Sequence, residues 1–422
     1  MCSLKVDVKR RKLLNSSEEL LELPKNELID RILQLEAHNK QLKSIVAKQN
    51  DFKDEQKKSS KKRKRSFDFS RFPKQHIAMK LLYLGWDYQG YASIEDSTNT
   101  IEHHLFAALK KSCLIENRET SNYNRCGRTD KTVSAFDQVV SLTVRAAKEG
   151  DPPLEYCKIL NRLLPKDIRT IAWQPAPEGF SARFDCQKRT YRYFFPRGDL
   201  NLDAMQRGAE YLIGTHDFRN LCKMDVANGV VAFDRTIDMA KIDVISHSTG
   251  CEGSGFEICE FTLTSKGFLW HQVRCIMGVL VLIGKSQEEP EIISQLLDIK
   301  TFPRKPQYCL AVGEPLNLFH CEFDLENWIV ETSSLNEVVQ TLQQEWTTHA
   351  IKGVMIEQML RGLDQTSDSV NMTLQASALL QGTQSKVYTA LSKRPTCESL
   401  ETRIAHYVEK GKIEVSDLEK SN

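Results

Sequence analysis

The order of apolar and polar residues predicts a mixture of strands and helices that begins near His76. The apolar run at 77–85 has the length of a strand, and a helical pattern starts at Ile101, with Asn99 as its N-cap and Glu102 three residues later. Further strands are expected at 140–144, 168–173, 190–195, 235–245 and 256–264, and further helices at 154–164, 203–213, 270–283 and 290–299. Because strands and helices do not alternate strictly, the pattern favours an α+β fold over a doubly wound one.

Two patterns mark the N-terminal segment. Apolar residues at a 4-3 spacing run from Leu28 to Val46, with Asn39 at one seam position, which is typical of a coiled coil. An amphipathic helix that packs on its own protein explains the same pattern. The basic run "KKSSKKRKR" at 57–65 fits a nuclear-import signal, an RNA-binding arm or a solvated linker.

These patterns divide the chain into three expected parts. Residues 1–75 carry the N-terminal helix and the basic linker, and residues 76–325 carry the regular strand and helix pattern. The pattern weakens over 326–422, where "MTLQASALLQGTQSK" is rich in Ser, Thr and Gln. We expect this last part to be a partly disordered appendage, with a charged helical segment near 400–409.

Composition limits the class of protein. The 422 residues are 41% hydrophobic and 27% charged with a net charge of +2, so nucleic-acid binding would depend on local basic patches. The twelve cysteines include no Cys-x-x-Cys pair and no nearby histidines at zinc-ligand spacing, which predicts reduced, mostly buried thiols and no metal site. The N-terminus has no signal-peptide core, and the longest apolar run, at 277–284, is too short to cross a bilayer. We therefore expect an intracellular protein without membrane association.

The first candidate for chemistry is the cluster "RCGRTDK" at 125–131. Asp130 follows Arg128 by two residues, so in an extended segment both side chains lie on the same face. The arginine would lower the pKa of Asp130 against the desolvation that would raise it, leaving an ionised carboxylate that can act as nucleophile or base. A loop aspartate in a salt bridge is the alternative interpretation.

The second candidate is "FSARFDCQKRTYRYFFP" at 180–196, where basic and aromatic residues interleave. Cations contact phosphates and ring faces stack on unpaired bases, so this composition suits RNA. An ordinary strand with one buried aromatic face and one exposed basic face fits equally well. The residues in question are Arg183, Lys188, Arg189 and Arg192, with Phe184, Tyr191, Tyr193 and Phe194.

The third candidate is "GFLWHQVRCIMG" at 267–278. Trp270, Val273 and Met277 mark one helical stripe, and Arg274 stands among apolar neighbours. A buried arginine needs a carboxylate partner, for which Asp130 is a candidate, whereas an arginine on the exposed side would need none. His271 could titrate or serve as a hydrogen-bonded packing residue.

Taken in this order, "GRTDKTVSA", "ARFDCQKRTYRY" and "FLWHQVRCIMG" resemble motifs of the TruA-type tRNA pseudouridine synthases. The resemblance covers about Ile77 to Phe323, so 76–325 would be the catalytic domain. Within the family, the chain is similar to the eukaryotic branch that acts at positions 38 and 39 of the tRNA anticodon stem-loop. Lys131, Ser134, "GTHDFRNLCKMDVANG" and the late "RPTCESLETRIAHYVEKGKI" carry that similarity.

The resemblance implies a role for each of five residues. Asp130 would be the catalytic residue, which attacks or deprotonates the uridine nucleoside so that the base detaches, rotates and rejoins through carbon. Tyr191 would stack on the base, Arg274 would pair with Asp130, Arg128 would hold the flipped nucleotide, and Leu316 would line the base pocket. The family fold is a mainly antiparallel sheet with flanking helices, built from two ferredoxin-like halves around an RNA-binding cleft. The resemblance implies tRNA as partner, a homodimer, and no metal or organic cofactor.

Two residues depart from the family pattern. Thr132 and Asp137 stand where glycine is usual or frequent, and a β-branched residue would be strained if position 132 needs a positive φ. The alternative function is therefore a catalytically weak or inactive tRNA-binding protein or chaperone of the same fold. A third possibility is a nuclear scaffold that pairs through the segment from Leu28 to Val46. The basic run at 57–65 leads us to expect a protein of nucleus and cytoplasm.

Overall fold

The computed structural model describes residues 29, 36, 67–94, 97–246, 255–364, 376–382 and 387–411. The chain divides into two compact units, residues 1–68 and 69–422. Apart from Ile29 and Glu36, which are helical, the predicted seam from Leu28 to Val46 lies outside the described residues, as does the basic run at 57–65. The account below concerns the second unit.

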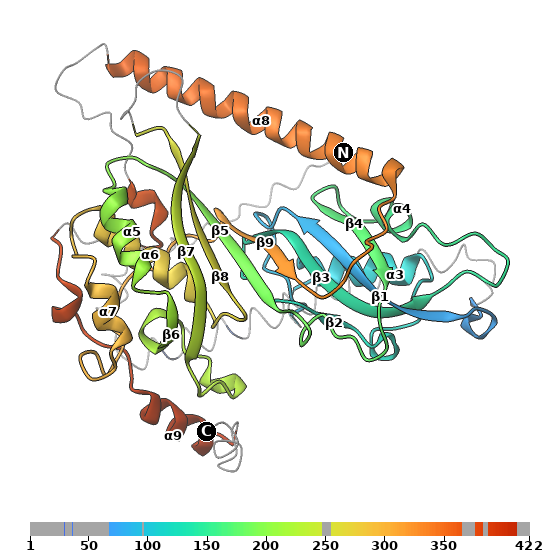
Figure 1. Ribbon diagram of the computed structural model, residues 1–422, viewed down its shortest axis with the longest axis horizontal. Coiled ribbons are helices and arrows are strands. Elements are labelled where there is room, and N and C mark those ends of the chain that lie inside the picture. Colours follow the sequence, from blue (N-terminus) through green and yellow to red (C-terminus); the bar gives the residue numbers. More distant parts are fainter. Residues whose placement is uncertain are drawn as a thin grey trace, which may run out of the picture. The chain divides into compact units, whose positions relative to one another are not determined.

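The second unit is built on a nine-stranded sheet in the order β4-β1-β3-β9-β5-β8-β7-β6, with β2 also paired to β3 (Figure 1). The strands are β1 (Lys74–Tyr83), β2 (Asn124–Arg125), β3 (Ser134–Arg145), β4 (Ile168–Pro175), β5 (Lys188–Pro196), β6 (Gly214–Asp217), β7 (Asp234–Ser246), β8 (Ile258–Ser265) and β9 (Leu316–Glu322). Every pairing is antiparallel except that of β3 with β9. The predicted α+β class with a mainly antiparallel sheet is confirmed.

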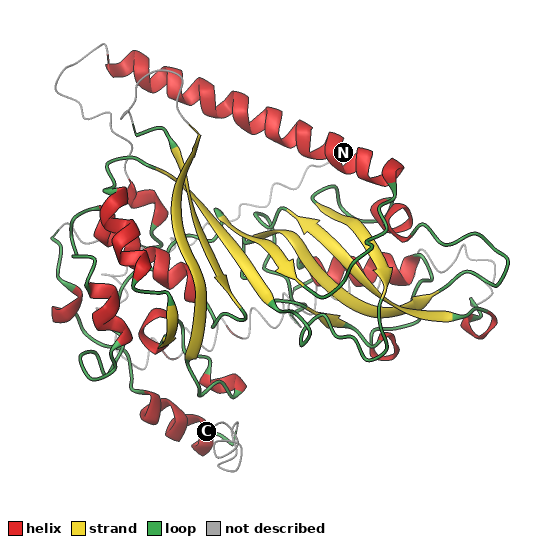
Figure 2. Cartoon of the chain, in the orientation of Figure 1, coloured by secondary structure: helices red, strands yellow, loops and turns green. Residues whose placement is uncertain are grey.

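Two stretches of the chain repeat one βαββαβ topology, the ferredoxin-like arrangement (Figure 2). The first runs β1, α3 (Ile101–Lys111), β2, β3, α4 (Tyr156–Asn161), β4; the second runs β5, α5 (Leu202–Glu210), β7, β8, α6 (Gln272–Gly284), β9. Their strands lie in equivalent orders, β4-β1-β3-β2 and β9-β5-β8-β7. Strand β6 and helix α7 (Ile292–Leu297) are additions to the second half. The two ferredoxin-like halves are therefore present as expected.

The halves join along one edge of β3. On that edge β2 pairs with Val140 and Ser141, whereas β9 pairs in parallel with Ser134 and Ala135. The segment that connects β2 to β3 must leave the sheet between these two partners. This places residues 126–133 at the junction of the two halves.

Two predicted helix starts needed correction. Thr100, rather than Asn99, caps α3, because its side chain accepts a hydrogen bond from the His103 amide. Helix α6 starts at Gln272, two residues later than expected, because His271 has a φ of 57°. All thirteen residues of α6 are buried. None of the described helices combines the length and the apolar character that a membrane span requires.

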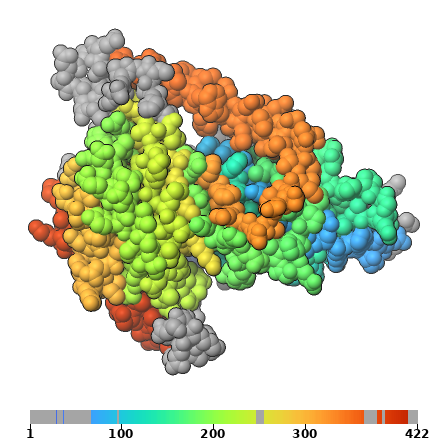
Figure 3. Space-filling model, in the orientation of Figure 1, coloured from blue at the N-terminus to red at the C-terminus, as the bar shows by residue number. Residues whose placement is uncertain are grey.

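The C-terminal part is more closely integrated than the expected appendage. It contains α8 (Thr332–Asp364), which Figure 3 shows as an exposed orange ridge, and α9 (Leu400–Glu409). Leu379, Leu380 and Leu391 join the main hydrophobic core, and the Val312 amide donates to the Leu379 carbonyl at 2.8 Å. The expected boundary at 325 therefore does not separate two compact units, whereas the one at 75 lies close to the observed division after Asp68.

Candidate active site

A cleft of about 1130 Å³ lies where the two halves meet. The first half contributes the segment 125–131, and the second half contributes Tyr191, Lys223 and the segment 267–274. All five residues proposed from the sequence for substrate handling or catalysis line it: Asp130, Tyr191, Arg128, Arg274 and Leu316. The fold thus brings together side chains that are almost two hundred residues apart in the sequence.

Hydrogen bonds from buried groups hold the segment that carries Asp130. The side-chain amide of Gln138, fully buried in β3, accepts from the Gly127 amide at 3.1 Å and donates to the Gly127 carbonyl at 3.0 Å. The Thr129 hydroxyl shares a hydrogen bond of 2.8 Å with Tyr83, and the Thr129 carbonyl accepts from the Tyr91 amide at 3.1 Å. The backbone that leads to Asp130 is therefore fixed at Gly127 and at Thr129, which preorganises the position of the Asp130 side chain.

A tight turn follows Asp130. The Val133 amide donates to the Asp130 carbonyl at 3.2 Å, and Thr132 has a φ of 67°. A turn of this kind favours glycine at its third residue, so the sequence-based suspicion about this position is confirmed. The turn nevertheless closes, and the Thr132 amide donates to the Tyr88 carbonyl at 3.1 Å.

The Asp130 carboxylate is close to two side chains of the third motif. Its Oδ2 lies 3.6 Å from Nη1 of Arg274 and 3.4 Å from Nε2 of His271. Burial raises the pKa of Asp130 above its ordinary value, while the charges of Arg274 and Lys223 oppose the shift. The sequence led us to expect that the charge of Arg128 would lower the pKa of Asp130. That expectation is wrong, because four-fifths of the Asp130 side chain is removed from water and desolvation outweighs the attraction of the positive charges.

Arg274 is a buried charge with two partners. It is 4% exposed, and besides its contact with Asp130 its Nε donates to the Ala311 carbonyl at 2.9 Å. The interpretation in which this arginine faces solvent is excluded. A buried guanidinium so placed supplies a fixed positive charge beside the carboxylate.

His271 contacts Asp130 as a neutral ring. Burial, followed by the charges of Arg274 and Lys223, lowers the pKa of His271 to about 4. At neutral pH the ring is uncharged, so its contact with the carboxylate is not an ion pair. Of the two roles left open for His271, the structure favours packing beside the reactive group.

An aromatic pair lines the cleft next to Asp130. Tyr191 is 9% exposed and packs edge-to-face on Phe268, with ring centroids 5.1 Å apart. Burial raises the pKa of Tyr191 well above its ordinary value, so its phenol stays protonated at neutral pH. Leu316, 4% exposed at the start of β9, adds an apolar side chain to the same cleft.

The rest of the cleft lining is strongly basic. Nine basic residues face two acidic ones, Asp130 and Asp225. The basic residues are Arg118, Arg125, Arg128, Lys131, Arg183, Arg189, Lys223, Arg235 and Arg274. The net charge of the whole chain is only +2, so this basic patch is not evident from the composition. A patch of this charge suits a polyanionic ligand.

Three residues that line the cleft were not assigned to it from the sequence. Lys223 stands 4.3 Å over the ring of Trp270, and both line the cleft together with Arg235. Trp270 was assigned to a helical stripe but precedes α6 and is 41% exposed. Lys223 lies in the segment 214–229 that carried the family resemblance but was given no role, and Arg235 had no signal, because each is an isolated basic residue that only the fold brings to the cleft.

The second unusual residue, Asp137, lies outside the cleft. It is 3% exposed in β3, where its carboxylate is 2.9 Å from Nζ of Lys80 and 2.9 Å from Nδ1 of His320. Asp137 is thus part of a buried ion pair within the sheet. It does not place a negative charge among the cleft-lining basic residues.

Comparison with known proteins identifies the family. A family model described as tRNA pseudouridine synthase matches residues 209–324. A tRNA pseudouridine(38/39) synthase of Bos taurus is 45% identical to the chain, over 92% of this chain and 88% of that protein. The chain belongs to the tRNA pseudouridine synthase family. The chain is also 34% identical to the tRNA pseudouridine(38/39) synthase of Saccharomyces cerevisiae, over 92% and 91% of the two lengths.

More distant members retain the catalytic unit without the flanking segments. The tRNA pseudouridine synthase A of Methanothrix thermoacetophila is 32% identical over 99% of its own length but only 69% of this chain. As a tRNA pseudouridine synthase, this protein is an isomerase, and its substrate is a polyanion. A cleft with nine basic residues and the largely buried Asp130 carboxylate is consistent with that chemistry.

Proposed function

We propose that this tRNA pseudouridine synthase isomerises uridines 38 and 39 of the tRNA anticodon stem-loop, with Asp130 as the catalytic group. The observation that carries the proposal is the buried Asp130 carboxylate, 3.6 Å from Arg274 in a cleft that is otherwise basic. The choice of positions rests on relatives named for them in Bos taurus and Saccharomyces cerevisiae.

The reaction is balanced without any other reactant. The bond between ribose C1′ and uracil N1 breaks, a bond between C1′ and C5 forms, C5 loses a proton and N1 gains one. Asp130 starts the sequence either by attacking the nucleoside or by removing a proton from it, and both routes require the ionised carboxylate. Arg274 stabilises that ionised form from a fixed position, which limits the reorganisation needed during the reaction.

The nucleotide must leave its helical stack to reach Asp130. In our proposal Tyr191 provides a ring for the extruded base, and Leu316 closes the pocket with an apolar surface. Because burial keeps the Tyr191 phenol protonated, it acts through its ring and as a neutral hydrogen-bonding group, and not as a phenolate base. Arg128, exposed at the cleft, holds the backbone of the flipped nucleotide.

The decisive experiment compares wild type with Asp130→Asn on an anticodon stem-loop RNA that carries uridine at positions 38 and 39. Pseudouridine is mapped by chemical modification followed by primer extension. We expect product at both positions for wild type and none for Asp130→Asn, with RNA binding retained in both. Asp225→Asn, the other carboxylate of the cleft, is the matched control and should remain active.

The rival function is a tRNA-binding protein of the same fold without activity. It predicts tight binding of the stem-loop by wild type and no product at any uridine. The strained φ of Thr132 is the observation that favours this rival. Product at uridines elsewhere in full-length tRNA, with none at 38 and 39, would retain Asp130 as the catalytic group and reject the proposed positions.

We further propose a homodimer, motivated by the predicted coiled-coil pattern from Leu28 to Val46 and, independently, by an exposed apolar stripe on α8. The side chains Ile351, Met355 and Met359 follow one another at four-residue spacing on α8, and each is more than half exposed. Exposed apolar stripes of this length are usual at interfaces between chains. We expect light scattering to give the mass of two chains.

The matched variants for this test add the same charge at different places on α8. Ile351→Glu with Met355→Glu should yield a monomer, whereas Gln343→Glu with Gln344→Glu, at exposed polar positions, should leave the dimer intact. A wild-type mass equal to one chain would contradict the homodimer.

We propose that the protein works in both nucleus and cytoplasm, with the basic run at 57–65 as the import signal. A fluorescent fusion should be present in both compartments. Replacing the lysines and arginines of the run by serine should exclude the fusion from the nucleus without changing activity on stem-loop RNA. Unchanged nuclear signal in this variant would contradict the assignment.

A further inference from the structure

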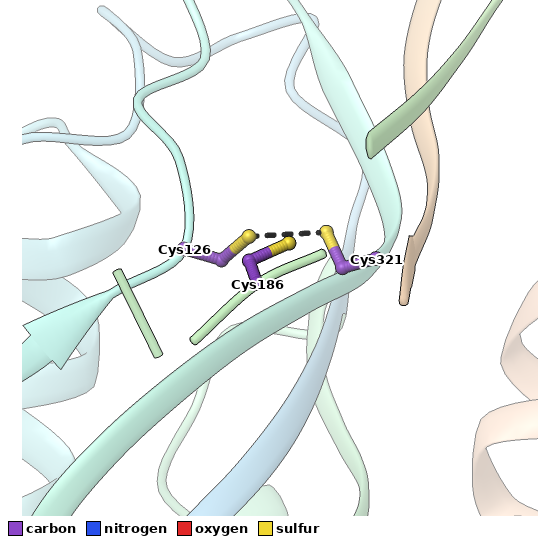
Figure 4. Close-up of side chains that lie close together, drawn as sticks. All are labelled: Cys126, Cys186 and Cys321. Atoms are coloured by element: carbon purple, nitrogen blue, oxygen red, sulfur yellow. Dashed lines mark hydrogen bonds between the residues drawn. The ribbon is translucent and has the colours of Figure 1, made fainter. Parts of the chain in front are cut away.

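Three cysteines from distant parts of the sequence lie close together (Figure 4). The sulfur atoms of Cys126, Cys186 and Cys321 all lie within 4.8 Å of one another, and those of Cys126 and Cys321 are 3.3 Å apart. The ten described cysteines form no disulfide, so these three are free thiols. Neither the fold nor the proposed reaction requires three thiols at one point.

The cluster links the segments that build the site. Cys126 lines the cleft and directly precedes Gly127 of the segment that carries Asp130. Cys321 belongs to β9, and Cys186 lies two residues before β5. All three cysteines are buried, at 2–4% exposure, and a ligand held by all three would join the two halves of the sheet.

The spacing of the sulfur atoms fits a tetrahedral metal ion. Zn–S bonds of about 2.3 Å place the sulfur atoms of a tetrahedral site about 3.8 Å apart. The observed triangle, with one edge of 3.3 Å and none above 4.8 Å, requires only small side-chain rotations to reach that value. Cys126 also lines the cleft, so water from the cleft is available as a fourth ligand.

The local charge favours a divalent ion. Arg189 donates from Nη2 to the Cys126 carbonyl at 2.9 Å, so one guanidinium stands beside the three sulfur atoms. Three thiolates, one divalent cation and this guanidinium have a total charge of zero, whereas a monovalent ion would leave a buried negative charge.

We propose that Cys126, Cys186 and Cys321 bind one Zn²⁺ ion through three thiolates, with water from the cleft as the fourth ligand. The ion fixes the position of the segment 126–130 relative to β9 and to the start of β5. Its role is structural, since it would touch neither the uridine nor Asp130. The spacing of cysteines along the sequence gives no sign of this site, because each ligand comes from a different segment.

Metal analysis of the full-length protein tests the proposal. After incubation with zinc and removal of unbound metal, wild type should retain one zinc ion per chain. Cys126→Ser, Cys186→Ser and Cys321→Ser should each retain at least tenfold less. Cys113→Ser, which removes a thiol outside the cluster, should retain the wild-type amount. Equal zinc in wild type and all three cluster variants would overturn the assignment.

Cobalt provides a test on wild type alone, so that misfolding of a variant cannot obscure the result. Co²⁺ bound by three thiolates should give a strong sulfur-to-metal charge-transfer band and the intense visible bands of tetrahedral cobalt. Binding should also release protons, because a thiol must lose its proton to coordinate the ion as a thiolate. A spectrum without the charge-transfer band would show that the thiols serve only as packing groups.

Discussion

Arg274 of helix α6 and Asp130 of the segment before β3 form a charge pair, with 3.6 Å between Nη1 and Oδ2, across the junction of the two half-sheets. The Asp130 carboxylate belongs to one ferredoxin-like half and its counter-charge to the other. Because the two groups belong to different halves, any displacement of one half relative to the other would change this distance. Stability and activity are therefore coupled at the same pair.

The first prediction concerns that coupling. Arg274→Met keeps an unbranched side chain but leaves the Asp130 carboxylate without its main counter-charge. Removing one member of a buried pair lowers the free energy of unfolding by about 3–5 kcal/mol. Since Asp130 is one-fifth exposed, we expect a decrease of about 2–3 kcal/mol, measured by urea unfolding. The reaction rate should fall by at least about a hundredfold. Arg274→Lys should recover part of both losses, and equal rates for Met and Lys variants would contradict an electrostatic role.

The pH dependence of the rate follows from the raised pKa of Asp130. The reaction needs the carboxylate, so kcat/KM should fall as the pH decreases through a value above the usual aspartate range of about 3.9. The same shift means that the charged carboxylate costs folding stability. Wild type should therefore lose stability relative to Asp130→Asn as the pH rises from the unfolded to the folded pKa of this group.

Three variants assign the acid limb of that profile. His271, with a pKa of about 4, titrates in a similar range, so His271→Asn separates the two groups and should leave the limb in place. Arg274→Lys should leave the limb near its wild-type position, and Arg274→Met should move it to higher pH. A limb that disappears with His271→Asn would assign the titration to the histidine.

A third prediction concerns the strained turn at Thr132. A left-handed conformation costs an L-residue about 1–2 kcal/mol, whereas glycine loses about 0.5–1 kcal/mol through the entropy of the unfolded chain. Thr132→Gly should therefore raise the free energy of unfolding by about 0–1 kcal/mol. The rate of pseudouridine formation should stay the same or increase. Thr132→Ala, which retains a Cβ at the same φ, should bring no such gain in stability. A Thr132→Gly enzyme that lost activity would show that the threonine side chain itself is needed.

A fourth prediction concerns Gly313, which packs directly against the same turn. A Cβ at Gly313 would lie 2.6 Å from Oγ1 of Thr132 and 2.9 Å from the Lys131 carbonyl oxygen. Gly313→Ala should therefore displace the turn, lower the rate and cost about 1–3 kcal/mol of stability. Combined with Thr132→Gly, the loss should be smaller than the sum of the two separate effects, as a double-mutant cycle would measure. Strict additivity would show that the two residues act independently.

The last prediction concerns RNA binding by the basic cleft. Arg183 is exposed at the cleft. It is far from Asp130 in the sequence and is not part of the pair formed by Asp130 and Arg274. Arg183→Ala should weaken stem-loop binding, reduce the slope of log affinity against log salt by about 0.7–0.9, and leave the rate at saturating RNA unchanged. Arg304→Ala, an exposed arginine outside the cleft, is the control and should leave the slope unchanged.

Much of the fold was predictable from local patterns. The strand at 77–85, the helix at 203–213 and the helix near 400–409 appear with ends shifted by only a few residues, because apolar periodicity and caps act within one element. Strand β9 was overlooked, since it is short and gains its stability from partners in both halves. Helix α8 was overlooked because much of its apolar surface is exposed and leaves no buried stripe to recognise.

For the site, the sequence by itself determined the candidate residues and one contact between them. A buried arginine amid apolar residues requires a carboxylate partner, which made Asp130 the candidate partner of Arg274. The observed distance of 3.6 Å agrees with that pairing. Only the tertiary structure decided the direction of the Asp130 pKa shift, the contribution of Lys223 to the cleft and the meeting of Cys126 with Cys186 and Cys321. The physical reason is common to all three: desolvation, Coulomb energy and metal coordination depend on distances between segments that are far apart along the chain, and periodicity within one segment carries no information about them.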